Sequence, residues 1–139
     1  MTREQWMIRW ILLLSGLFLM SAFLTTLLPV SWMNATHRWL GLGDFPDFPI
    51  TKYLARSTSL LYGVHGLLMF YTGITIEHHW RFVKIFGWLH VLMGSSMVLI
   101  DVTSNMPTYW TALEGPPVAI LGVIILVLLK RAGFGESRH

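Results

Sequence analysis

Long apolar stretches separated by short polar segments dominate the chain. Four stretches, over about residues 10–30, 54–76, 83–103 and 116–129, approach the length needed to cross a bilayer. A helix needs about 20 residues to span a hydrocarbon core that is roughly 30 Å thick. The apolar character is continuous rather than alternating, which favours helices over a β-barrel. The pattern predicts an all-α integral membrane four-helix bundle, with residues 1–139 as a single transmembrane domain.

The composition agrees with a membrane protein and limits its chemistry. Hydrophobic residues make up 54% of the chain, charged residues make up 12%, and cysteine is absent. Disulfides, thiolate nucleophiles and cysteine-bound metals are therefore excluded. Adjacent His78 and His79 supply no third ligand on their own turn, so we expect neither a metal nor a cofactor. The ten Lys and Arg flank the apolar stretches rather than forming a stripe, which argues against nucleic-acid binding.

The first stretch also has features of a signal peptide. Arg3 and Arg9 precede the apolar run, and a site of small residues ends at Ala22. Met20 occupies the minus-three position of that site, where a small residue is needed, and the run continues to Val30. We therefore expect an uncleaved helix.

Positive residues predict the orientation, because Lys and Arg near the spans are retained in the cytoplasm. With four spans, both termini and the second loop share one side, which holds seven positive residues: Arg3, Arg9, Arg81, Lys84, Lys130, Arg131 and Arg138. The other side holds three: Arg38, Lys52 and Arg56. The distribution predicts that both termini lie in the cytoplasm.

Two loops connect the first three spans. The outer loop, over about residues 31–53, contains a predicted interfacial helix at Trp32–Leu40 and an extended segment at Asp44–Pro49, where two prolines disfavour helix. We expect it to cap the bundle without binding a ligand. The second loop, Glu77–Arg81, is short enough to make the second and third spans antiparallel neighbours. Its basic and aromatic residues suit contact with anionic headgroups.

Small and polar residues recur on one face of the third span: Gly87, His90, Gly94, Met97 and Asp101. Their spacing of three and four residues predicts a face that packs inward. The second span carries a similar small face: Ser59, Gly63, Gly66 and Gly73. Glycines let two backbones approach closely, so these two spans are predicted to form the tight pair of the bundle.

Three charged residues are expected to meet near the outer boundary of the membrane. Asp101 lies 17 residues beyond Lys84 and Glu114 lies 16 residues before Lys130, which places both carboxylates roughly 24–25 Å from the cytoplasmic ends. The long side chain of Arg56 can reach down toward that level.

Two interpretations of this cluster stay open. In the structural one, Arg56 and Asp101 form an ion pair that locks two helices, and Glu114 sits near the N-terminus of the fourth helix, where the helix dipole favours it. In the functional one, the second carboxylate adds a spare charge in an apolar pocket that handles protons or binds a cationic or hydroxylated ligand. The mouth of that pocket would be lined by aromatic side chains, namely Tyr53, Tyr109 and Trp110.

Two histidines, His65 and His90, also lie inside predicted spans, where a pair could ligate a haem. Counted from Glu77 and Lys84, they lie roughly 18 Å and 9 Å from the cytoplasmic ends. Because they miss a common level, we expect no haem and interpret each as a hydrogen-bonded packing residue.

Several short motifs carry a resemblance: Tyr53-Leu54-Ala55-Arg56-Ser57, Tyr62, His65-Gly66, Asp101, Met106-Pro107 and Glu114-Gly115-Pro116. Over roughly Trp39 to Leu128 the chain resembles small, uncharacterised four-span bacterial membrane proteins, which are similar in size and helix layout to the DoxX-like group. That group takes its name from a subunit of a quinone-linked oxidoreductase. The resemblance implies an accessory role in a redox complex.

The sequence therefore predicts a structural or accessory subunit of a membrane complex, with membrane lipid, another membrane protein or a second copy as its partners. The alternative is a small membrane enzyme or binding protein for a lipid-like molecule or quinone at the outer leaflet, using Arg56, Asp101 and Glu114. A transporter is a third possibility, because four spans make a pore only by oligomerising.

Overall fold

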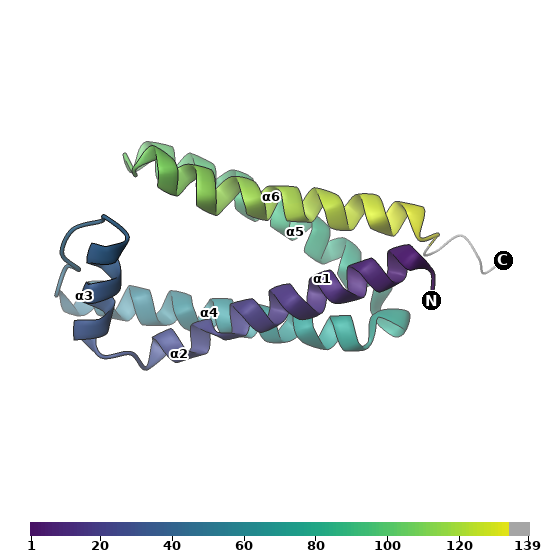
Figure 1. The fold of residues 1–139 in the computed structure, drawn as a ribbon, viewed down its shortest axis with the longest axis horizontal. Helices are drawn as coiled ribbons and strands as arrows, with labels where there is room; N and C mark the ends of the chain where they lie inside the picture. Colours follow the sequence, from purple (N-terminus) through teal and green to yellow (C-terminus); the bar gives the residue numbers. More distant parts are fainter. Residues whose placement is uncertain (134–139) are drawn as a thin grey trace. The chain divides into compact units, whose positions relative to one another are not determined.

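The computed structural model describes residues 1–133, and this part of the chain is helical with no strand. Figure 1 shows the elements in chain order: α1 (Arg3–Met20), α2 (Ala22–Thr26), α3 (Val30–Trp39), α4 (Pro49–Ile74), α5 (Ile76–Thr103) and α6 (Thr108–Arg131). The predicted all-α class is confirmed. Arg138, one of the positive residues used to predict the orientation, lies outside the described residues.

Three helical stretches are long and apolar enough to cross a membrane: Arg3–Thr26, Ile76–Thr103 and Thr108–Arg131. They support a membrane protein and coincide with three of the four predicted spans, with changed bounds. The first consists of α1 and α2, which are separated at Ser21. The remaining helix, α4, has 26 residues but is not among the three. Arg56, His65 and several glycine and hydroxyl-bearing residues lower its hydropathy.

Residues 77–81, predicted as the second loop, lie in the first turns of α5, and the helix is broken within them at His79, so the prediction is confirmed only as a break between two helical stretches. Only Thr75 separates α4 from α5. The segment contains neither proline nor glycine to end a helix, and Glu77 in the first turn complements the helix dipole. The irregularity is instead a kink at His79, whose φ of −123° and ψ of 28° are not helical.

The chain divides into two compact units. One, here called the α5–α6 unit, contains Met1–Leu12 and the chain from Thr72 onward. The other, here called the α1–α4 unit, contains Leu13–Tyr71. The first turns of α1 and the last residues of α4 therefore belong to the α5–α6 unit.

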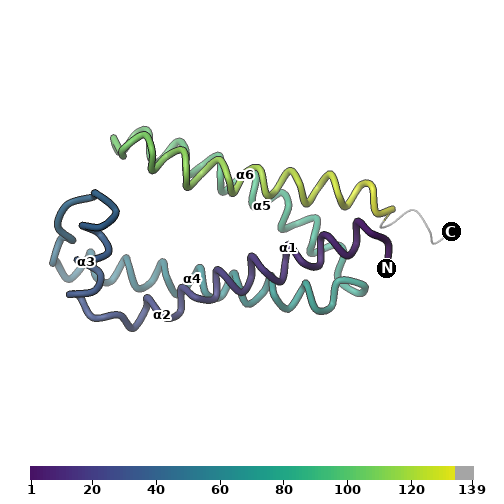
Figure 2. The backbone as a smooth tube through the Cα atoms, viewed as in Figure 1, coloured from purple at the N-terminus to yellow at the C-terminus, as the bar shows by residue number. Residues whose placement is uncertain are grey.

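In the α5–α6 unit, α5 and α6 pack against each other through glycines (Figure 1). A methyl group on Gly122 would lie 2.6 Å from the carbonyl oxygen of Gly87, and one on Gly115 would lie 2.7 Å from that of Gly94. The two glycine pairs are seven residues apart on both helices, so one antiparallel register runs through them. Figure 2 shows the chain turning back between the helices, where Asn105 adopts a positive φ of 54°.

In the α1–α4 unit, α1 and α4 meet through Gly16 and Gly66. A methyl group on Gly66 would lie 2.7 Å from the carbonyl oxygen of Gly16, and one on Gly16 would lie 2.8 Å from that of Gly66. A methyl group on Gly63, one turn earlier on α4, would lie 2.6 Å from the ring of Phe23.

These contacts correct the predicted pairing of the second and third spans. The glycine faces themselves are confirmed, since Gly63, Gly66, Gly87 and Gly94 are all buried. The close neighbours that the structure shows for them, however, lie on α1 and α6 respectively. A row of glycines indicates that another backbone comes close, but it carries no information about which helix that backbone belongs to.

The segment before α4 folds back on α3. The predicted helix over Trp32–Leu40 is confirmed as α3, and the extended segment after it is confirmed as non-helical up to residue 48, since Pro49 begins α4. The side-chain oxygen of Asn34 accepts a hydrogen bond of 2.8 Å from the backbone N–H of Phe45. Arg38 and Asp44 form an ion pair that closes the same loop.

Candidate functional site

Asp101 lies near the C-terminal end of α5 and is only 5% exposed. Its carboxylate oxygen Oδ2 is buried and has no hydrogen-bond partner in the part of the chain that the structure describes. A buried acceptor without a donor costs about 1–3 kcal/mol, and more when the group is charged. Such residues inside a membrane helix normally pair with another group or bind a ligand. Asp101 is therefore the first candidate for a ligand-binding residue.

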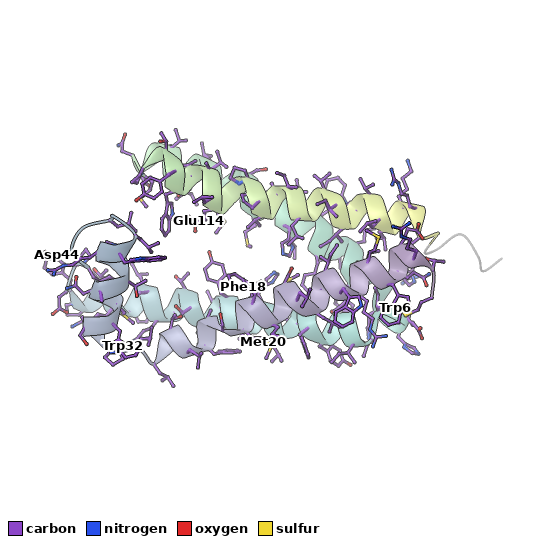
Figure 3. The ribbon with its side chains drawn as sticks, in the orientation of Figure 1. Trp6, Phe18, Met20, Trp32, Asp44 and Glu114 are labelled. Carbon is purple, nitrogen blue, oxygen red and sulfur yellow. The ribbon has the colours of Figure 1, made fainter. Side chains whose placement is uncertain are left out.

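Glu114 lies on α6, in its N-terminal part, and is half-buried (Figure 3). The indole Nε1–H of Trp110 donates a hydrogen bond of 2.5 Å to its oxygen Oε2. The two residues are four positions apart and so occupy the same helix face. This bond fixes the direction in which the carboxylate points.

Asp101 and Glu114 lie close enough for their charges to repel each other. The helix geometry explains how this comes about. Side chains on a helix lean toward its N-terminus, so Asp101 leans along α5 toward Gly94 and Glu114 leans along α6 toward Trp110. Because α5 and α6 are antiparallel, the two carboxylates lean toward each other.

The predicted equal depth of the two carboxylates needs a correction. The register set by Gly94 opposite Gly115 places Thr108 opposite Asp101, and Glu114 opposite Ser95. The two backbone positions are therefore about six residues, or roughly 9 Å, apart along the helix pair. Equal distances from Lys84 and Lys130 mean equal depths only if the two lysines lie at the same level along the helix pair. The glycine register does not place them at the same level.

The six residues of the predicted cluster are divided between the two units. Asp101, Tyr109, Trp110 and Glu114 belong to the α5–α6 unit, whereas Tyr53 and Arg56 are exposed side chains of the α1–α4 unit. Among these residues, the described contact is the hydrogen bond from Trp110 to Glu114. The ion pair between Arg56 and Asp101 stays a prediction.

Of the two histidines, His90 is buried in α5 and donates a hydrogen bond of 2.7 Å from Nδ1 to the carbonyl oxygen of Phe86. The predicted hydrogen bond of His90 is therefore present, and its role as a packing residue stays a prediction. His65 is half-buried in α4, in the other unit. The predicted absence of haem stays a prediction. Within residues 1–133, no group of three or more His, Asp or Glu could hold a metal ion.

A shallow groove of about 480 Å³ also lies at the turn between α5 and α6, and sequence reasoning did not identify it. It is lined by Val102, Asn105, Met106, Thr108, Thr111, Ala112 and Pro116. Steps of four residues place Thr108, Ala112 and Pro116 on one stripe of α6, and Glu114, midway between the last two, points to another side. Neither Asp101 nor Glu114 lines the groove.

Comparison of the chain with protein-family models, curated proteins and solved structures finds no match. The case for function rests on the chemistry of Asp101, Glu114 and Trp110. Two acidic side chains and one indole inside a membrane protein can bind hydroxyl groups, cations or protons, but they contain no nucleophile activated by a neighbouring base.

Proposed function

We propose that the chain is a multi-pass protein of the bacterial inner membrane, in which α4 is a fourth span of a four-helix bundle. Its 26 residues reach about 39 Å, which is long enough to cross. Large apolar side chains of α4 are exposed, including Leu61 at 69% and Leu68 at 53%, as expected of a lipid-facing helix. Lys52 and Arg56, its two basic residues, lie together near one end.

Both termini are proposed to lie in the cytoplasm, because the described positive residues outside α3 and α4 lie near the start of α1, the start of α5 and the end of α6. Single cysteines at Thr2, His78 and Asp47 test this. In intact cells, a membrane-impermeant thiol reagent should label the cysteine at Asp47 and leave the other two unlabelled. Labelling at His78 but not at Asp47 would invert the orientation.

For the function, we propose that the protein binds a hydroxyl-bearing, lipid-soluble molecule in the outer half of the membrane through Asp101 and Glu114. The observation that carries the proposal is the buried, unpartnered Oδ2 of Asp101. A hydroxyl hydrogen bonded to this oxygen would remove the cost of leaving it unsatisfied. It would also ease the repulsion between the two carboxylates.

The class of ligand follows from the surroundings of the site. Asp101 and Glu114 lie within apolar helices, so a ligand that arrives from the bilayer must be largely apolar with a few hydroxyl or carbonyl groups. A quinol or a hydroxylated lipid has this character. An ionised carboxylate accepts a hydrogen bond from the hydroxyl of a quinol, and a protonated one donates to the carbonyl of a quinone.

The accessory-subunit function is compatible with this ligand and is the second candidate. Only 17–28% of the residues in an apolar 18-residue stretch of each of the three spans are buried inside the structure, so most of this surface is available to lipid or another protein. Gentle purification separates the two candidates. A stable protein partner without a bound small molecule would favour the accessory role alone, whereas a co-purifying quinol or hydroxylated lipid would favour the binding function.

The binding function is tested by extracting the lipids that co-purify with the protein in mild detergent and identifying them by mass spectrometry. Asp101→Asn keeps the size of the side chain but removes its charge, and should lower the amount of bound quinol or hydroxylated lipid about tenfold, which corresponds to about 1.4 kcal/mol. Glu77→Gln, which removes an exposed carboxylate from the first turn of α5, is the matched control and should leave the amount unchanged.

Thermal unfolding of the same samples separates binding from folding. Asp101→Asn should unfold at the same temperature as the parent protein or higher, because it removes an unsatisfied buried charge. Equal amounts of bound lipid in Asp101→Asn, Glu114→Gln and the parent protein would overturn the proposed function.

A further inference from the structure

A second groove lies on α5, at the opposite end of that helix from Asp101. It has a volume of about 540 Å³ and is open along one side. Its lining comes entirely from α5: Trp80, Arg81, Lys84, Ile85, Trp88, Leu89 and Leu92. Steps of three and four residues connect these positions, so they form one stripe along the helix. The groove therefore depends on no other element.

The two ends of this stripe differ in character. Arg81 and Lys84, at one end, are exposed cations. From Ile85 to Leu92 the lining side chains are apolar and exposed, with Trp88 at 60% and Leu92 at 65%. The stripe therefore places two positive charges directly beside a continuous apolar surface.

The cations of the stripe are available to a ligand. Neither Arg81 nor Lys84 forms an ion pair in the described part of the chain. The guanidinium of Arg81 lies 5.6 Å from the ring centroid of Trp80, a cation–π contact that orients it without neutralising it. The kink at His79 separates this segment from the preceding turn, where Glu77 would otherwise stand four residues before Arg81 on a regular helix.

We propose that this stripe is a binding site for an anionic phospholipid. Arg81 and Lys84 would hold the phosphate and the negatively charged headgroup, and an acyl chain would lie along Ile85, Trp88 and Leu92. The eight helical steps from Lys84 to Leu92 cover roughly 12 Å, a length that an acyl chain can follow into the membrane. An indole near the headgroup level, here Trp80, is common at membrane interfaces.

Charge complementarity selects the occupant. A zwitterionic lipid would bring its own cation close to Arg81 and Lys84, whereas phosphatidylglycerol brings only the phosphate charge. Each Lys or Arg near an anionic membrane surface strengthens binding by about fivefold, so the pair should favour the anionic lipid by roughly 30-fold. The site lies at the other end of α5 from the carboxylates and does not depend on the proposed function.

Native mass spectrometry of the purified full chain in detergent provides the test, with phosphatidylglycerol and phosphatidylcholine of identical acyl chains as probes. The parent protein should bind phosphatidylglycerol more tightly by roughly 30-fold, and Arg81→Gln/Lys84→Gln should lose this preference. The matched control is Lys130→Gln/Arg131→Gln, which removes the same charge from the end of α6 and should keep most of the preference. An equal loss in both double variants would overturn the site, because it would reduce the effect to net charge.

A second measurement distinguishes a lipid site from a simple anion site. Trp88→Ala removes apolar surface but no charge, and should weaken binding of long-chain phosphatidylglycerol several-fold while leaving folding intact, since Trp88 is exposed. Excess inorganic phosphate should displace little of the lipid. Complete displacement by phosphate, together with no effect of Trp88→Ala, would show that the stripe binds free anions and would overturn the proposal.

Discussion

Glycines bring two helices into close contact in both the α5–α6 unit and the α1–α4 unit, but the two units differ in the number of glycine pairs and in the length of the connection between the helices. Two reciprocal glycine pairs hold α5 to α6, whereas one such pair, Gly16 with Gly66, holds α1 to α4. Residues 104–107 join the first two helices, and residues 21–48, a segment seven times as long, join the second two. By loop-closure entropy alone, the longer connection costs about 2 kcal/mol more to close.

The comparison extends to polar chemistry. Among the described residues, the buried polar or charged side chains are Thr72, His90 and Asp101, and all three belong to the α5–α6 unit. A rigid, closely packed helix pair can hold a buried carboxylate in one position. The α1–α4 unit instead places its ion pairs in the exposed segment around α3. The tighter unit therefore carries the candidate site.

The largest effect is expected from Gly94→Ala. The added methyl group would lie 2.5 Å from the carbonyl oxygen of Gly115 and would also meet the backbone of Ala119. Backbone cannot rotate away, so the helices must separate, at a cost of about 3 kcal/mol in the free energy of unfolding. Titration with sodium dodecyl sulfate, followed by circular dichroism, measures this cost.

The matched control for Gly94→Ala is Gly87→Ala. Its methyl group would meet the side chain of Leu126 at 2.7 Å, and that side chain can change rotamer. The expected cost is about 1 kcal/mol. Equal costs at the two positions would mean that the glycines are not there to let the backbones approach.

A smaller effect is expected from Gly66→Ala in the α1–α4 unit. The methyl group would lie 2.6 Å from the backbone nitrogen of Met20 and 2.7 Å from the carbonyl oxygen of Gly16. With one glycine pair and a long connection, α1 can shift more easily, so we expect about 2 kcal/mol. Gly63→Ala, which meets the movable ring of Phe23, is the control. A cost above that of Gly94→Ala would reverse the ranking of the two units.

Sequence reasoning found the helices because hydrocarbon demands long apolar runs, and it found the glycine faces because they repeat at helical spacing. It could not assign the partner of each face. Gly94 and Gly66 have the same local sequence pattern, although one packs against the next helix in the chain, α6, and the other against the distant helix α1. The start of α5 differs from the prediction for another reason: residues 77–81 are mostly polar and resemble a loop, but they contain no proline or glycine, and the break in the helix is confined to a kink at His79.

The candidate site was partly predictable. Asp101 and Glu114 are conspicuous as carboxylates within apolar stretches, and Trp110 stands four residues before Glu114. Their relative depth was not predictable, because it depends on the register between α5 and α6. That register depends on which glycines of α5 and α6 lie opposite each other. The number of residues between each carboxylate and Lys84 or Lys130 does not determine it.

The smallest effect is expected from Trp110→Phe, which tests a polar contact in the unit otherwise held by glycines. The change removes the indole N–H that bonds Glu114 but keeps an aromatic ring on the same face of α6. We expect the free energy of unfolding to fall by about 1 kcal/mol, because the hydrogen bond is to a carboxylate but is only partly buried. A double-mutant cycle with Glu114→Gln isolates the bond from the change in ring size.

Trp88→Phe, at an exposed position on α5, controls for the loss of an indole and should change stability by less than about 0.5 kcal/mol. Additive effects of Trp110→Phe and Glu114→Gln would mean that Trp110 does not orient the carboxylate, and that Glu114 is free to turn away from Asp101.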